Sequence, residues 1–181
     1  MVNNIQRSAS LFLVKNIFSF LLSLFSVVFM MSYPLRPSQI SLISMFTIGI
    51  PGFFLAFQPN KDVIKGHFLT NVVLKALPAG LTDVLAVAAM AVFGQTFGLG
   101  ETDISTAGTM LLAIVGFMIL FKICEPFNWL RGCVWVGSVI GLLGCSIFLP
   151  KLFAITGMST KCIMLFVVFS IATEPLFRYL T

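Results

Sequence analysis

Two ionisable residues of this sequence lie deep inside apolar segments. Lys15 lies within the segment 8–31, and Asp83 lies near the middle of the segment 68–93. Even the most lenient insertion scale assigns a charge at the centre of a membrane helix a cost of about 2.5 kcal/mol, so such a residue is a functional candidate by default. Because their charges are opposite, the two side chains could pair in one state and separate in another. We therefore expect a functional or pairing role for both.

Hydroxyl side chains form a second pattern. Polar residues recur on roughly one face of the first segment at helical spacing, namely Ser8, Lys15, Ser19, Ser23 and Ser26. The next segment has Ser41, Ser44 and Thr47, followed by Gly49 and Pro51. Proline removes a backbone donor, and a broken helix at membrane depth is tolerated only where it is buried or lines a cavity. The two stripes either face each other across a polar path or simply allow close helix packing.

The other ionisable residues lie nearer the ends of their segments. Lys75, Lys122 and Glu174 are close enough to the expected interfaces to extend their charged groups toward water. Lys122 and Glu125 are three residues apart and could pair on a helix. We keep Lys122 and Glu125 as candidates for a transport path.

The elements that position these residues must be membrane helices. The chain has 181 residues, of which 59% are hydrophobic and 9% are charged, against about 25% charged in a soluble domain. This composition excludes a cytosolic globular enzyme. The net charge of +5 comes from scattered Lys and Arg, so no nucleic-acid partner is expected. Four cysteines without a C-x-x-C motif and a single histidine indicate no structural zinc site, and metal ligands stay unassigned.

The apolar stretches suit helices that cross a hydrocarbon core of about 30 Å. They predict an all-α integral membrane protein, a six-transmembrane-helix bundle that forms one membrane domain with no soluble domain. The expected spans are 8–31, 38–57, 68–93, 106–124, 133–149 and 162–180. The distribution of Lys and Arg between the two sides favours cytoplasmic termini, so we expect a multi-pass protein of the cytoplasmic membrane, surrounded by the lipid bilayer.

Three segments resemble membrane helices of the P-type cation-transporting ATPases. VNNIQRS at 2–8, running into Lys15-Asn16, resembles the start of that family's fifth transmembrane helix. LISMFTIGIP at 42–51 and FQPN at 57–60 are similar to its sixth helix, and KICEPFN at 122–128 to the end of its eighth. The whole chain thus resembles the C-terminal membrane region, helices five to ten, of a bacterial pump.

The resemblance implies an ion-pathway module that forms part of the cation site and transmits motion from cytoplasmic domains. The family's D-K-T-G, T-G-E and G-D-G-x-N-D motifs do not occur in this sequence. We therefore expect this chain itself to bind no cofactor, while the parent pump uses ATP and Mg²⁺. The expected partners are a transported cation and, if it is separately encoded, the N-terminal half of the pump with helices one to four and the cytoplasmic domains. Whether the chain alone is an enzyme stays open.

Carried over residue by residue, the calcium-pump ligand positions fall on Asn16, Ser19, Ser44, Ile48 and Lys122. Among them Asn16 keeps the family's residue, and no carboxylate remains for a hard divalent cation. Lys15 beside Asn16 also resembles proton-exporting members in which the lysine acts as a tethered counter-charge. The identity of the ion stays open, and the transport-path candidates are Lys15, Asn16, Ser19, Ser44, Thr47, Pro51, Asp83, Lys122 and Glu125.

Two other functions fit the same residues. A stand-alone secondary carrier or permease would also use a broken helix with buried Lys and Asp, although residues 1–90 and 91–181 show no internal repeat. A non-transporting membrane subunit is the third interpretation.

Overall fold

The computed structural model describes residues 2–56, 68–125 and 128–180. These residues form helices and connections, with no strand among them. The helices are α1 (Val2–Val28), α2 (Pro37–Ser44), the π-helix η1 (Met45–Gly49), α3 (Ile50–Ala56), α4 (Phe68–Thr96), α5 (Glu101–Cys124), α6 (Trp129–Phe148) and α7 (Thr160–Leu180).

Within the described ranges, six helices are long and apolar enough to cross a membrane, and α2, η1 and α3 together supply one of them, Pro37–Leu55. The predicted all-α six-helix membrane bundle is therefore confirmed, whereas the cytoplasmic location of the termini stays a prediction. Residues 58–67, which separate the expected second and third spans, lie outside the described residues, as do the side chains of Ser8 and Lys75.

Helix α5 begins earlier than the sequence predicts, at Glu101 rather than at 106. Glu101 and Asp103 both lie in its first turn. Acidic side chains at this place complement the positive end of the helix dipole, so the two residues extend the helix although they lower the local hydropathy.

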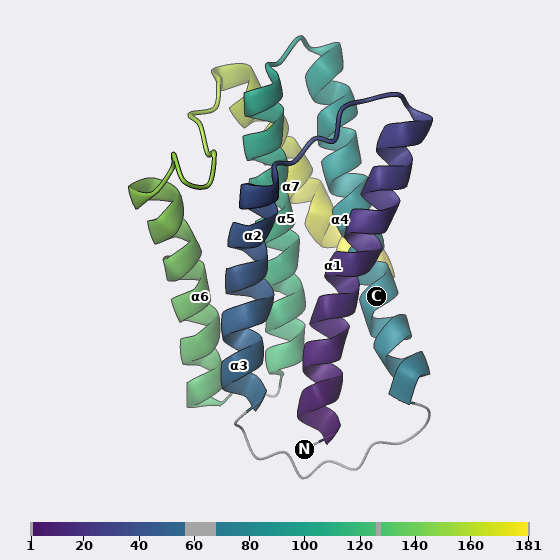
Figure 1. Ribbon diagram of the computed structural model, residues 1–181, viewed down its shortest axis with the longest axis vertical. Helices are drawn as coiled ribbons and strands as arrows, with labels where there is room; N and C mark the ends of the chain where they lie inside the picture. The colour runs from purple at the N-terminus through teal and green to yellow at the C-terminus, as the bar shows by residue number, and fades with distance from the viewer. Residues whose placement is uncertain (1, 57–67, 126–127, 181) are drawn as a thin grey trace.

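Helices α4 and α5 form the middle of the bundle, and α1 packs along α4 (Figure 1). More than half of the α4 and α5 spans is buried, against 17% of α6 and 11% of α7. The outer helices therefore present apolar faces that suit contact with lipid. The connections 29–36, 97–100 and 149–159 gather at the end of the bundle opposite the N-terminus (Figure 1).

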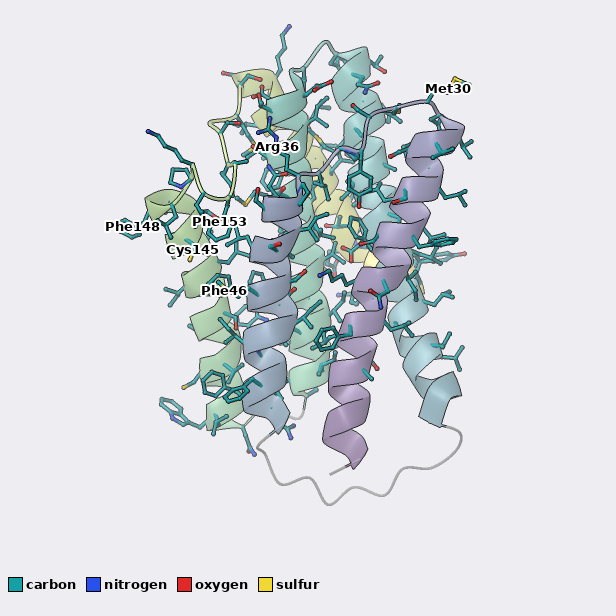
Figure 2. All side chains as sticks on the ribbon, viewed as in Figure 1. Met30, Arg36, Phe46, Cys145, Phe148 and Phe153 are labelled. Atoms are coloured by element: carbon teal, nitrogen blue, oxygen red, sulfur yellow. The ribbon has the colours of Figure 1, made fainter. Side chains whose placement is uncertain are left out.

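Small residues set how closely the helices approach. A Cβ atom on Gly80 of α4 would lie 2.8 Å from Cγ2 of Ile17 in α1, so this helix pair meets in close contact. Phe46 of η1 is directed toward α6, where Gly141 leaves room for its ring (Figure 2). The second span, which stays helical through its π-helical turn, is thus held between α1 and α6.

A buried glutamine joins three segments near the connections opposite the N-terminus. Gln39 of α2 is completely buried. Its Nε2 donates to Ser105 Oγ at 3.2 Å and to the Ala154 carbonyl at 3.0 Å. Its Oε1 accepts from the Arg36 backbone N–H at 2.9 Å. The side chain therefore fastens α2 to α5 and to the segment that follows α6.

Candidate cation site

A cavity of about 40 Å³ lies between α1, the α2–η1 segment, α4 and α5. Its polar lining residues are Lys15, Ser44, Thr47 and Asp83, and the other nine lining residues are apolar or glycine. By the same measure of volume one water occupies about 10–15 Å³. The cavity therefore has room for a small ion with one or two waters.

Asp83 is the acidic residue of this cavity. Its side chain comes from α4, and 3% of the residue is exposed. Its Oδ1 atom is buried without a hydrogen-bond partner. A buried polar atom without a partner forfeits its hydration, which costs about 1–3 kcal/mol and more for a charged group. Such an orphaned carboxylate oxygen beside a cavity is a natural ligand for a cation.

Lys15 supplies the positive charge of the cavity. It is half-buried on α1, and α1 contacts α4 more extensively than it contacts any other helix. Lys15 and Asp83 line the same cavity, but no ion pair within 4.0 Å joins them in the described part of the chain. The two residues of opposite charge therefore share one cavity without forming an ion pair in this state.

The two hydroxyl groups of the cavity present oxygen rather than hydrogen. Ser44 Oγ donates to the Ile40 carbonyl at 2.7 Å, and Thr47 Oγ1 donates to the Ile43 carbonyl at 2.8 Å. Because each hydroxyl hydrogen is used within its own helix, only lone pairs are left for a ligand. Both groups therefore act as acceptors toward the cavity.

The π-helix η1 loosens the backbone beside these hydroxyls. The Ile50 N–H donates to the Met45 carbonyl, and Pro51 has no N–H to donate. The Phe46 carbonyl would accept from the Ile50 N–H in an α-helix and from the N–H of residue 51 in a π-helix. Because Ile50 donates to Met45 and Pro51 has no N–H, the Phe46 carbonyl has neither donor. Where the sequence predicts a break, around Thr47–Pro51, the helix continues in this form, and π-turns are frequent at functional sites.

Three other candidates on α1 and α3 lie outside the cavity lining. The Asn16 side chain is exposed. Ser19 is half-buried and hydrogen-bonds to Tyr33, a contact that the sequence pattern did not indicate. Burial raises the pKa of the Tyr33 phenol, and the Ser19 hydroxyl offsets part of this rise. Pro51 is buried and is not among the residues that line the cavity.

The ionisable residues near the helix ends also lie away from the cavity. The Lys122 ammonium is 4.9 Å from the centre of the Phe177 ring, within the range of a cation–π contact. Glu125 is exposed and ends α5 in an extended conformation. Glu174 pairs with Arg178 at 2.6 Å on the surface of α7. Within the described ranges, no three His, Cys, Asp or Glu residues gather as a metal-binding group.

Comparisons with known proteins point to one class of transporter. No protein-family model matches the chain. The "probable cation-transporting ATPase exp7" of Streptococcus pneumoniae is 35% identical over 167 residues, which cover 88% of this chain and 21% of that protein. The calcium-transporting ATPase CtpE of Mycolicibacterium smegmatis is 30% identical over 144 residues, covering 72% of this chain and 18% of that protein. CtpE of Mycobacterium tuberculosis is 32% identical over 146 residues with the same coverage.

The chain is a homologue of the P-type cation-transporting ATPases. It spans about a fifth of the length of the curated relatives that it matches. Together with the six apolar helices, this homology supports a multi-pass membrane module of a cation pump. The resemblance drawn from the helix motifs is thereby confirmed.

Proposed function

We propose that the cavity between α1, the α2–η1 segment, α4 and α5 is part of the cation path of an ATP-driven pump. The observation that carries the proposal is Asp83, a buried carboxylate whose Oδ1 has no partner and which shares its cavity with Lys15. Ionisable residues inside membrane spans are costly and mark ion pathways. The names of the relatives, cation-transporting and calcium-transporting ATPase, support a cation as the cargo.

The α1 helix is the element suited to transmit motion to this cavity. It carries Lys15, it contacts α4 more extensively than any other two helices contact each other, and it also touches η1 and α3. A shift of α1 along α4 would therefore move Lys15 relative to Asp83 and change what the cavity can hold. In the complete pump the force would come from cytoplasmic domains that use ATP and Mg²⁺, together with helices one to four, supplied within one longer chain or by a separate one.

The test uses the complete pump, with this chain joined to or expressed beside those domains. Asp83→Asn keeps the size of the side chain and removes its charge, so we expect ATP-dependent cation uptake into membrane vesicles to fall at least about tenfold. Glu174→Gln, an exposed position on α7, is the matched control and should transport like the wild type. Transport by Asp83→Asn at the wild-type rate would place the cation path elsewhere.

Phosphoenzyme formation from ATP separates the pump from the other functions. Phosphoenzyme that depends on both the chain and a transported cation supports the proposal. Cation flux through vesicles that hold this chain alone, without ATP, would instead show a carrier or permease. If neither phosphoenzyme nor flux is detected, the remaining interpretation is a non-transporting membrane subunit.

A further inference from the structure

We infer that the cavity binds a monovalent metal cation, such as Na⁺ or K⁺, with the Asp83 carboxylate as its charged ligand and the Ser44 and Thr47 oxygens as neutral ligands. The inference rests on the proposed function and specifies the class of cargo. The inferred ion is not the one in the relatives' names, since two of these relatives are named as calcium-transporting.

The charges that line the cavity favour a single positive charge. One carboxylate, Asp83, and one ammonium, Lys15, face it from different helices. Calcium sites gain affinity from the number of charged oxygen ligands. For a divalent ion the attraction to Asp83 and the repulsion from Lys15 both double and offset each other, so the cavity does not compensate the much larger cost of dehydrating that ion.

The hydroxyl geometry favours a metal cation over a proton. Ser44 and Thr47 direct their hydrogens to the Ile40 and Ile43 carbonyls, so they offer the cavity lone pairs and no donor. A proton on Asp83 would need one acceptor and no further space, whereas a metal ion uses several oxygens and the volume of about 40 Å³. The oxygens of Asp83, Ser44 and Thr47, with one or two waters, make such a partial shell.

The apolar lining helps to select against hydrated ions. Phe18 and Leu112 are buried and, with the aliphatic side chains around them, leave no further polar group to hold a water shell. An ion must therefore shed most of its water to enter. Dehydration is far easier for a monovalent cation than for Mg²⁺, which gives up its waters reluctantly.

The test measures cation protection of Asp83 in the full chain, kept in native membrane vesicles. Dicyclohexylcarbodiimide, an apolar reagent that reacts with buried protonated carboxyl groups, is added to the vesicles, and mass spectrometry gives the modified fraction of Asp83. Choline chloride at equal ionic strength is the reference. We expect NaCl or KCl to lower the modification several-fold and CaCl₂ to lower it less at the same concentration.

A matched pair of lysine variants tests the role of Lys15. Lys15→Gln removes the repulsion, so we expect Ca²⁺ to protect Asp83 at a concentration about tenfold lower than in the wild type. Lys161→Gln, at an exposed position on α7, should leave every protection curve unchanged. Equal Ca²⁺ protection in the wild type and Lys15→Gln would overturn the inference.

The remaining outcomes separate this inference from the proposed function. Protection by Ca²⁺ at lower concentration than by Na⁺ or K⁺ would overturn the monovalent assignment and leave the cavity as a cation site. No protection by any of these cations would overturn the inference, while the loss of transport in Asp83→Asn would still support the proposed path. Absence of modification at Asp83 even in choline chloride would show a carboxyl that solutes do not reach from the membrane, and would also overturn the inference.

Discussion

Gly116 of α5 lies so close to Thr47 of η1 that a Cβ atom on the glycine would come within 2.8 Å of the threonine Cγ2. Both residues line the cation cavity. Because position 116 has no side chain, α5 can approach the π-helix closely. The Thr47 side chain then packs directly against the backbone of α5.

Gly116→Ala should destabilise the chain because the new methyl group has no space. Overpacking of this kind costs about 1–3 kcal/mol. The matched control is Gly144→Ala on α6, where a Cβ atom would meet nothing within 4 Å, and alanine in a helix should be neutral or slightly stabilising. Unfolding by sodium dodecyl sulfate, followed by circular dichroism, compares the two variants. Equal stability of both would show that α5 and η1 are not in close contact.

Gln39→Ala should weaken the end of the bundle opposite the N-terminus. The change removes three hydrogen bonds and leaves their partners, among them the Ser105 hydroxyl and the Ala154 carbonyl, without the glutamine. At about 1 kcal/mol for each bond, we expect the free energy of unfolding to fall by about 2–3 kcal/mol. Gln95→Ala, exposed on α4, should change it by less than about 0.5 kcal/mol. A loss at Gln39 no larger than at Gln95 would contradict this prediction.

The approximate length of the helices could be predicted because the thickness of the bilayer fixes it, and their number follows from the number of apolar stretches of that length in the sequence. A local disturbance near Thr47–Pro51 was also predictable, since proline lacks an N–H wherever it lies, but the helix continues through a π-helical turn and is not broken there. The start of α5 was not, because Glu101 and Asp103 lower the local hydropathy although they favour a helix N-terminus. Hydropathy and helix propensity give opposite indications at such a boundary.

The cavity could be predicted only in part. Lys15 and Asp83 stood out because charge is costly inside an apolar span, yet the sequence does not say which helices are neighbours or how each is rotated. The structure leaves the Asn16 side chain exposed, one residue from the half-buried Lys15. The Ser19–Tyr33 contact was missed because the connection after α1 folds back along the helix, which no local pattern indicates.

Tyr33 should make stability depend on pH in the alkaline range. Burial raises the pKa of its phenol above the ordinary value of 10.0, so the folded chain keeps a proton that the unfolded chain loses first. Stability is therefore full below pH 10 and falls as the pH rises from there toward the folded pKa. Unfolding free energies measured across this range should show the decline.

Tyr33→Phe is the variant that isolates this effect, since phenylalanine keeps the ring and removes the ionisable group. The decline of stability above pH 10 should be smaller in Tyr33→Phe than in the wild type. Tyr179→Phe, at an exposed position near the end of α7, should retain the wild-type slope. If all three proteins lose stability in parallel, Tyr33 is not the group responsible.

Asp83→Asn should stabilise the chain although it should inactivate the pump. The wild-type carboxyl group is buried with Oδ1 unpartnered, and a neutral amide of similar size costs less to bury than an unpaired charge. We expect the free energy of unfolding to rise by about 1–2 kcal/mol. The control is Asp103→Asn, because Asp103 Oδ2 accepts from the Ser159 N–H at 3.3 Å in an exposed setting and its loss should be neutral or slightly destabilising. A lower stability of Asp83→Asn would show that Asp83 holds the bundle together, and its position in the cavity would then be structural rather than a cost retained for ion binding.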